Sequence, residues 1–218
     1  MLGRGKNQER AVPAKALRLF LASSNLGKLN EFRALASKLT GAASLDLQLL
    51  PNFPALPAFE ESAPTFSENA AGKALHYSRF SDSPVMAEDS GLVVGALGGA
   101  PGVRSARYAG PDASSAERIA KLLGEMRERG ARDWRARFAC VIALAVRGRV
   151  VAVFSDSVEG EILETSRGSS GFGYDPVFFF RPAAKSFAEM SADEKNQYSH
   201  RAKAFRKLAD FLASSPVL

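Results

Sequence analysis

Two long apolar segments that flank Arg147 and Gly148 constrain the fold of this chain more than any other feature. The segments are WRARFACVIALAV, residues 134–146, and RVVAVFS, residues 149–155. A two-residue connection that ends in glycine is typical of a β-hairpin, so these segments are predicted to pair as antiparallel strands. VEGEIL, residues 158–163, predicts a third strand directly after the hairpin.

Strand and helix patterns alternate before this hairpin. An apolar run over residues 16–22 predicts a buried strand, and the polar loop SSNLGK follows it. Apolar residues at helical spacing then predict a helix over residues 29–39 that ends at Gly41. Residues 45–64 are rich in proline and acidic side chains, and they predict an extended, mostly exposed connection.

Capping boxes mark the start of three further helices, because in each a serine or threonine is followed three positions later by glutamate. These helices are predicted over residues 66–80, 115–130 and 192–212. An aromatic run, VFFF at residues 177–180, follows the loop SRGSSGFGYDP. The sequence shows no repeat and no clean domain boundary, so the order of elements indicates a mixed α/β fold.

The composition favours one α/β domain that needs no disulfide bonds. The 218 residues carry a formal net charge of +6, which suggests an anionic partner, either nucleic acid or a phosphorylated small molecule. Residues 1–15 are basic and polar and are expected to form a flexible leader, with a single domain over residues 16–218. Cys140 lies in an apolar run, which predicts a buried, reduced thiol in a cytoplasmic protein.

The stretch MAEDSGL, residues 86–92, places two acids side by side after the short predicted strand PVMA. Successive side chains of a strand point to opposite faces, so Glu88 and Asp89 begin on opposite faces. A turn at Ser90 and Gly91 is predicted to bring both near one site before LVVGAL, another apolar run. Asp89, last before that turn and at the sheet edge, is the candidate for chemistry, and Glu88 is expected to support it.

Carboxylates at a sheet edge suit magnesium. This ion usually keeps several waters and binds one or two protein carboxylates together with phosphate oxygens of a substrate. Glu60 and Glu61, in the acidic connection, are candidates for additional ligands. The alternative is that each of them is an ordinary solvated surface acid.

The loop SSNLGK, residues 23–28, has features of an anion-binding loop. It joins a predicted strand to a predicted helix, where backbone amides, hydroxyl groups and the positive end of the helix dipole gather, and Lys28 can reach a phosphate. The loop is not a Walker A motif, because Ala22 and Leu29 stand where that motif has its first glycine and its magnesium-binding hydroxyl. An ordinary helix cap beside a solvated lysine is the alternative.

Three clusters near the glycine-rich loops and the C-terminal helix suit a nucleotide. In GFGYDP, glycines let the backbone approach a flat ligand and an aromatic ring can stack on it, although a ligand-free turn has the same composition. In YSHR, His200 and Arg201 can donate to a carbonyl or hold phosphate, whereas a lone histidine is more often structural. Arg104 and Arg107 can fold over a phosphate chain or pair with a neighbouring acid.

These clusters follow one another in an order that closely resembles the inosine triphosphate pyrophosphatase family, also called the Ham1 family. The motifs that carry the resemblance are SSNLGK, TFSENAAGKA, AEDSGLVVGALGGAPGVRSARYAG, GFGYDPVFF, Lys185 and SHR. The resemblance spans residues 17–212. Two departures are mild: Glu88 stands where many bacterial members have aspartate, and serines replace the commoner threonine and glycine before Asn25.

The resemblance implies an elongated mixed β-sheet with flanking helices, forming two lobes around a central cleft, and a homodimer. It also implies magnesium-dependent hydrolysis of non-canonical purine nucleoside triphosphates (ITP, dITP and XTP) to the monophosphate and pyrophosphate. In this chemistry water attacks the α-phosphorus, a carboxylate takes its proton, and cations stabilise the leaving pyrophosphate.

The resemblance also assigns roles to matching positions. Asp89 becomes the proton acceptor and, with Glu60, a magnesium ligand. Lys28 and Lys73 supply positive charge for the leaving group, and Phe172 stacks on the purine. The positions that match substrate-binding positions of the family are Ser23, Ser24, Asn25, Leu26, Gly27, Lys28, Lys73, Ser90, Phe172, Gly173, Tyr174, Asp175, Lys185, His200 and Arg201.

Two other classes of protein stay open on the sequence. A Maf-type enzyme shares the general fold and also releases pyrophosphate but prefers other modified nucleotides. A non-catalytic nucleic-acid-binding protein would account for the positive charge and for aromatic residues among glycines, but acids at the presumed site argue against it. The expected partner is therefore a nucleoside triphosphate rather than a nucleic acid polymer or a membrane.

Overall fold

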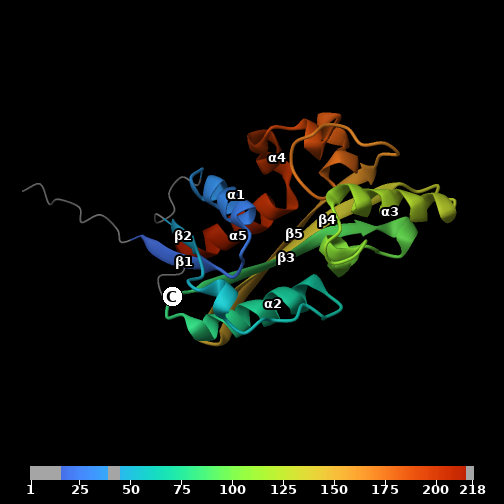
Figure 1. Ribbon diagram of the computed structural model, residues 1–218. Helices are drawn as coiled ribbons and strands as arrows, with labels where there is room; N and C mark the ends of the chain where they lie inside the picture. The colour runs from blue at the N-terminus through green and yellow to red at the C-terminus, as the bar shows by residue number, and fades with distance from the viewer. Residues whose placement is uncertain (1–15, 39–44, 215–218) are drawn as a thin grey trace, which may run out of the picture.

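The computed structural model describes residues 16–38 and 45–214. The leader predicted over residues 1–15 and the helix end predicted at Gly41 lie outside them. The described chain forms one seven-stranded sheet, in the order β2-β1-β3-β4-β5-β6-β7, with helices on both faces (Figure 1). The predicted α/β fold with a mixed sheet is confirmed.

The sheet is mixed because β1 runs parallel to both β2 and β3, whereas all later pairs are antiparallel. The strands are β1 (Leu17–Leu21), β2 (Leu45–Leu49), β3 (Val85–Val94), β4 (Arg135–Val146), β5 (Arg149–Ile162), β6 (Phe178–Phe180) and β7 (Lys185–Ser186). The α-helices are α1 (Leu26–Ala36), α2 (Phe66–Tyr77), α3 (Ser115–Glu128), α4 (Ala192–Tyr198) and α5 (His200–Ser214).

Three hydrophobic clusters hold the helices against the sheet. On one face, α1 and α5 pack on β1, β3 and β4, with the rings of Phe32 and Phe205 5.1 Å apart. On the opposite face, α2 packs through Ala70 and Ala74. The third cluster joins α3 to β6 at the other end of the long strands β3, β4 and β5, which gives the molecule an elongated shape (Figure 1).

The predicted turn at Ser90 and Gly91 is wrong, because β3 runs straight through these residues. Each residue of β3 has a partner in β4. Gly91 marks a close approach instead: a Cβ there would lie 2.4 Å from Ser105 Oγ, in the 3-10 helix η4 (Gly102–Arg107). The missing side chain therefore lets η4 dock on the strand.

The structure corrects four other boundaries. The connection predicted over residues 45–64 begins with β2, since alternating leucines let this segment pair with β1. VEGEIL is the end of β5 rather than a separate strand, because pairing with β4 continues through it. The C-terminal helix is divided at Ser199, which has an extended backbone. Helix α1 begins at Leu26, because Asn25 caps it.

The hairpin, the helix caps and the buried cysteine are confirmed. Arg147 and Gly148 have φ values of 48° and 75°, as expected of a two-residue turn between twisted strands. Thr65 and Ser114 accept the capping hydrogen bonds of α2 and α3. Cys140 is fully buried in β4. Among the described residues, no helix has the length and apolar character needed to cross a bilayer.

Candidate active site

The candidate site lies where β1 ends beside β3. Only Phe20 and Leu21 of β1 pair with β3, so within the described residues no strand lies beside this edge at Glu88 or Asp89. These acids point to opposite faces of the sheet: Glu88 contacts Arg201 of α5, and Asp89 contacts Asn69 of α2. Both acids therefore reach one site without a turn in the strand.

Asp89 is a largely buried carboxylate on the α2 face. Its Oδ2 accepts a hydrogen bond from Asn69 Nδ2 at 3.0 Å. Burial raises the pKa of Asp89 to about 6; the charges of Glu61 and Glu88 act in the same direction, against the hydrogen bond from Asn69. A carboxylate that titrates near neutrality is suited to accept a proton from water.

Glu88 lies on the opposite face between two cations. Lys28 Nζ is 2.6 Å from Glu88 Oε2, and Arg201 Nη2 is 3.0 Å from Glu88 Oε1. Burial alone would raise the pKa of Glu88, but the charges of Arg201 and Lys28 hold it well below its usual value. Arg201 also pairs with Glu31 at 2.8 Å. Glu88 is thus an ionised counterion that holds Lys28 beside the edge of β3.

The loop between β1 and α1 places Lys28 there. Asn25 is the N-cap of α1, and its Oδ1 accepts from the Lys28 amide at 3.1 Å. Ser23 Oγ accepts from the Asn25 amide at 3.0 Å. The exposed residues of the loop are Ser24, Asn25, Leu26 and Gly27. The helix cap expected from the sequence is confirmed, and it leaves the start of α1 beside the site. Anion binding by this loop stays a prediction.

Residues 58–64, called here the acidic segment, cross the α2 side of the site. Lys73 Nζ donates to Glu61 Oε1, and Arg107 Nη2 donates to the Glu61 carbonyl oxygen at 2.8 Å. The charge of Glu61 acts on Asp89, whereas Glu60 is exposed. Of the two acids considered as metal ligands, Glu61 is the one with an electrostatic link to Asp89.

Phe172 presents an aromatic ring to solvent on the α5 side. Its side chain is 54% exposed, and its ring centre lies 4.7 Å from Lys195 Nζ and 5.3 Å from Arg201 Cζ. Buried Asp175 shapes this loop, since its Oδ2 accepts from the Phe172 amide and from Lys195 Nζ. Tyr174 is buried and donates to a carbonyl of η4. Phe172 is therefore the ring of this motif that can stack on a ligand.

His200 lies inside the structure rather than on the surface of the site, whereas Ser90 is half-buried beside Arg201. His200 is buried and stacks on Phe138, with ring centres 4.9 Å apart and planes 10° from parallel. Burial lowers the pKa of His200 well below its usual value, so its imidazole is neutral. Ser90 Oγ accepts from Arg201 Nη2 at 3.3 Å.

Lys185 and Gly173 adjoin the Phe172 loop rather than Asp89. Lys185, in β7, pairs with Glu194 at 2.8 Å. Gly173 donates its amide to Ser115 Oγ, at the start of α3, at 3.2 Å. Among the described residues, neither contact joins these two positions to the charged network around Asp89.

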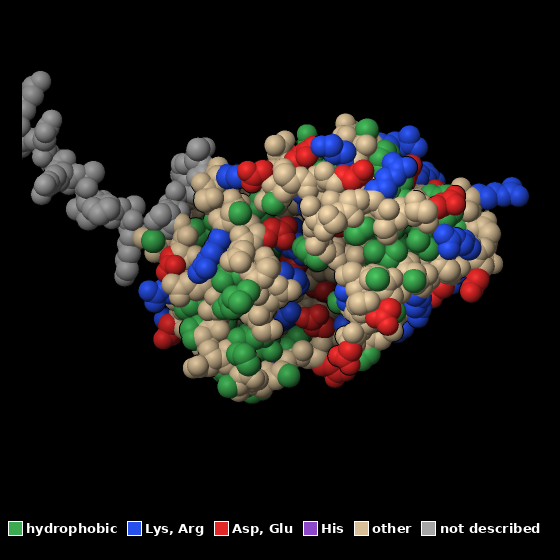
Figure 2. Space-filling view, turned by 45° about the horizontal axis from the view of Figure 1, so that its top comes forward, with side chains coloured by type: hydrophobic (Ala, Val, Ile, Leu, Met, Phe, Trp, Pro, Cys, Tyr) green, Lys and Arg blue, Asp and Glu red, His purple; other side chains and the backbone are tan. Residues whose placement is uncertain are grey.

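The space-filling view shows a hollow between the two ends of the elongated molecule, in which acidic and basic side chains lie next to one another (Figure 2).

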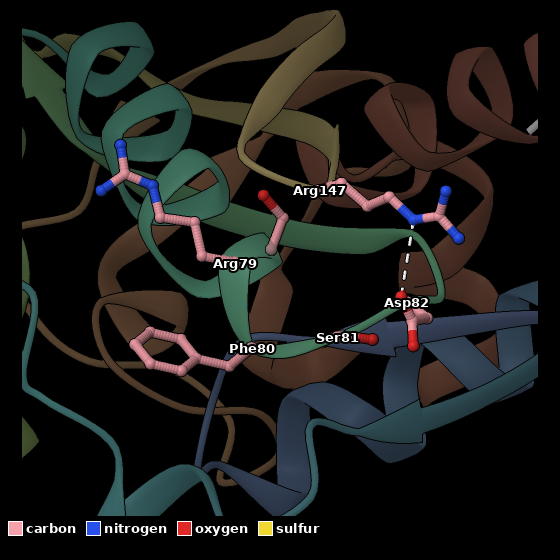
Figure 3. A pocket seen from close by; sticks show the side chains of 6 residues that line it. Arg79, Phe80, Ser81, Asp82 and Arg147 are labelled. Atoms are coloured by element: carbon pink, nitrogen blue, oxygen red, sulfur yellow. Dashed lines mark ion pairs between the residues drawn. The ribbon is translucent and has the colours of Figure 1, made fainter.

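A separate cavity of about 490 Å³ lies beyond the end of α2. It is lined by Ser78, Arg79, Phe80, Ser81, Asp82 and Arg147. There Arg147 Nε pairs with Asp82 at 3.5 Å, and Arg79 extends to the other side (Figure 3). The two guanidinium groups do not converge on a shared ligand position.

A profile of the Ham1 family matches residues 19–211. The chain belongs to the Ham1 family. A family relative, the dITP/XTP pyrophosphatase of Geobacillus kaustophilus, is 48% identical over 190 residues, which are 87% of this chain and 91% of the relative. The dITP/XTP pyrophosphatase of Syntrophobacter fumaroxidans is 46% identical over 190 residues, 87% of this chain and 79% of the relative.

Solved structures of Ham1 proteins have the same fold. The Ham1 protein from Coxiella burnetii superposes with a TM-score of 0.81 at 38% identity, covering 91% of this chain and 100% of the other. The nucleoside-triphosphatase / dITP/XTP pyrophosphatase from Mycobacterium abscessus gives a TM-score of 0.69 at 33% identity, covering 92% and 100%. The Ham1 resemblance identified in the sequence is therefore confirmed.

The donor set of this Ham1 protein fits magnesium. Asp89 and Glu61 offer carboxylate oxygens, the ligand type that magnesium prefers. Within the described residues, no three histidine, cysteine or acidic side chains gather as a metal site. Magnesium suits such a sparse site, because water and substrate phosphates usually complete its coordination.

Sequence reasoning missed two members of the Ham1 site and gave no role to a third. Glu31 lies three positions after Lys28 on α1, a spacing that places both on one helix face. Lys195 precedes the SHR motif and contacts Asp175. Asn69 lies one turn before Lys73 on α2, but helix spacing alone does not indicate its contact with Asp89.

Proposed function

We propose that this Ham1-family protein hydrolyses the non-canonical purine nucleoside triphosphates ITP, dITP and XTP to the monophosphate and pyrophosphate, and so cleanses the nucleotide pool. One observation carries the proposal: Asp89, a carboxylate with a pKa near neutrality, lies at an open strand edge. Lys28 pairs with the adjacent Glu88, and Lys73 pairs with Glu61, whose charge acts on Asp89. The names of relatives at 46–48% identity, dITP/XTP pyrophosphatases, support the substrate class.

Asp89 orients a water molecule for in-line attack on the α-phosphorus and accepts its proton as the bond to the pyrophosphate breaks. Lys28 and Lys73 stabilise the negative charge that develops on the leaving pyrophosphate. Asp89 with Glu61 or Glu60 would hold magnesium, which would supply further positive charge to the phosphate oxygens when bound. The start of α1, with its free amides, holds the phosphate chain.

Phe172 stacks on the purine, and donors from the backbone near His200 and Arg201 face its 6-position, since the side chains of these two residues are buried. Hypoxanthine and xanthine carry a keto oxygen there, which accepts a hydrogen bond. Adenine carries an amino group, which donates, so donors placed for a keto group would be left unpaired. A site built in this way disfavours adenine nucleotides strongly.

The test is a product-resolved turnover panel with ITP, dITP, XTP, dATP and modified pyrimidine triphosphates, with and without magnesium. Pyrophosphate is the expected first product with the first three substrates, and Asp89→Asn is expected to abolish it. Orthophosphate as the first product would contradict the proposal. A preference for modified pyrimidines would instead favour Maf-type specificity, and salt-sensitive binding of nucleic acid without turnover would favour a non-catalytic role.

We also propose that the protein is a cytoplasmic homodimer. Val150, Val151 and Val153 of β5 are 40%, 42% and 46% exposed, and among the described strands the outer edge of β5 is paired only at its end with β6. Covering such an apolar edge with a second copy would remove it from water. Light scattering is expected to give twice the chain mass. The fully buried Cys140 is compatible with a reducing compartment.

A further inference from the structure

Asn69, on α2, contacts both Asp89 and the acidic segment. Its side chain is almost fully buried. Asn69 Nδ2 donates to Asp89 Oδ2 at 3.0 Å and to the Ala63 carbonyl oxygen at 3.3 Å. Asn69 Oδ1 accepts from the Ala63 amide at 3.0 Å. One buried amide therefore joins the candidate catalytic carboxylate to the backbone of the acidic segment.

These contacts also fix which way the amide of Asn69 faces. A backbone N–H only donates, so the atom against the Ala63 amide must be the carbonyl oxygen Oδ1. The NH₂ group then faces Asp89 Oδ2, an acceptor. A flipped amide would set two donors against each other at Ala63 and two acceptors against each other at Asp89. Asn69 is thus held as a donor to Asp89.

Before Ala63, the acidic segment lies along the part of α2 that follows Asn69. Phe59 packs over Gly72, where a Cβ would come within 2.6 Å of the phenyl ring. One helical turn after Asn69, Lys73 holds the carboxylate of Glu61. The segment has no regular secondary structure of its own, so these side chains of α2 set its position.

We propose that Asn69 is a positioning residue, which holds Asp89 Oδ2 and the acidic segment in fixed relation so that Asp89 presents one defined oxygen to the attacking water. This role rests on the proposed pyrophosphatase function and deepens it. Within residues 16–38 and 45–214, Asp89 Oδ1 accepts no hydrogen bond, so it is the oxygen left for water or metal. Asn69 itself acts only through Asp89.

Two variants test this role with dITP and magnesium. Asn69→Asp keeps an acceptor for the Ala63 amide but loses the donor to Asp89, and Asn69→Ala loses both. Removing a hydrogen bond that positions a functional side chain lowers kcat by about 10–100-fold, while KM is expected to change less than about 3-fold, because Lys28 and Lys73 are intact. A raised KM with unchanged kcat would overturn the proposal.

Ser78→Ala is the matched control. Ser78 is also buried, lies directly after α2, and accepts from the Gly148 amide at 3.0 Å, far along the helix from Asp89. It is expected to lower the melting temperature without lowering kcat. If Ser78→Ala reduces kcat as much as Asn69→Asp does, loss of helix stability explains both and the positioning role is wrong.

A structural readout separates this proposal from the proposed function. In a crystal structure of Asn69→Ala without nucleotide, the Asp89 carboxylate is expected to rotate and the acidic segment to shift. Unchanged positions of both would contradict the positioning role, whatever the activity. Failure of the unaltered protein to hydrolyse dITP, with the Asp89 rotation still observed, would overturn the proposed function alone.

Discussion

Lys28 Nζ lies 2.6 Å from Glu88 Oε2, and this contact ties the loop after β1 to the buried guanidinium of Arg201. Arg201 contacts Glu31 on α1 and approaches the ring of Phe172. One connected set of charges therefore links residues 23–28, the loop proposed to bind phosphate, to Phe172, the ring proposed to stack on the base. Substitutions at different residues of this set should therefore change either the free energy of unfolding or the kinetics of hydrolysis.

Glu88→Gln is expected to destabilise the fold. Removing one partner of a buried ion pair leaves Arg201 partly uncompensated, which lowers the free energy of unfolding by about 3–5 kcal/mol. Urea denaturation measures the loss. Glu161→Gln is the control, because Glu161 pairs with the exposed Arg181 and should cost less than about 1 kcal/mol. Equal losses in the two variants would contradict a buried role for Glu88.

Asp89→Asn is expected to stabilise the fold. The pKa of Asp89 is raised from 3.8 to about 6 in the folded protein, so folding favours the protonated form. The contribution of Asp89 to stability is then greatest below pH 3.8 and is lost as pH rises through about 6. At about 1.4 kcal/mol per pH unit, ionised Asp89 lowers the free energy of unfolding by about 3 kcal/mol.

The comparison is made by urea denaturation in EDTA at pH 8 and pH 4. The Asn variant should be more stable than wild type at pH 8, and this advantage should shrink at pH 4. Taking the difference between variant and wild type at each pH cancels the other titrating groups. An advantage that is the same at both pH values would show that ionisation of Asp89 is not its source.

Much of this fold was predictable because its signals are local. The hairpin at Arg147 and Gly148 and the caps of α2 and α3 depend on a few neighbouring residues, and each was confirmed. The course of β3 was not predictable in this way. Ser90 and Gly91 have turn composition, but Gly91 is required by the approach of η4, a contact that no local pattern reveals.

The site was predictable in its residue types but not in its pairings. The sequence placed Glu88 and Asp89 on opposite faces, which is correct, and then required a turn to unite them, which is wrong. What unites them is the early end of β1, a feature of sheet topology. The contact of Asn69 with Asp89 likewise joins residues 20 positions apart, and helix spacing cannot predict it.

Phe172→Ala is expected to weaken nucleotide binding with little loss of stability, because the ring is half exposed. Stacking of a base on an aromatic ring contributes about 1–3 kcal/mol, so KM for dITP should rise about 10-fold or more. Steady-state kinetics measure this. Tyr198→Ala removes another partly exposed ring, one that packs on Phe180, and should leave KM unchanged. A KM that responds equally to both would argue against a platform at Phe172.

Arg107→Ala is expected to loosen the acidic segment. Arg107 Nη2 donates to the Glu61 carbonyl oxygen at 2.8 Å, and this exposed contact links η4 to the segment. A hydrogen bond from a charged donor contributes about 1.5–3 kcal/mol, so amide exchange in residues 58–64 should accelerate by about 10-fold or more. Glu61 would then be held less firmly near Asp89, and kcat/KM should fall.

Arg104→Ala is the matched control for this variant, since Arg104 is exposed in the same helix η4 and makes no side-chain hydrogen bond within residues 16–38 and 45–214. Hydrogen exchange by mass spectrometry should show faster exchange in the acidic segment of Arg107→Ala and wild-type exchange in Arg104→Ala. Identical exchange in both variants would mean that α2, through Asn69 and Lys73, holds the segment without help from η4.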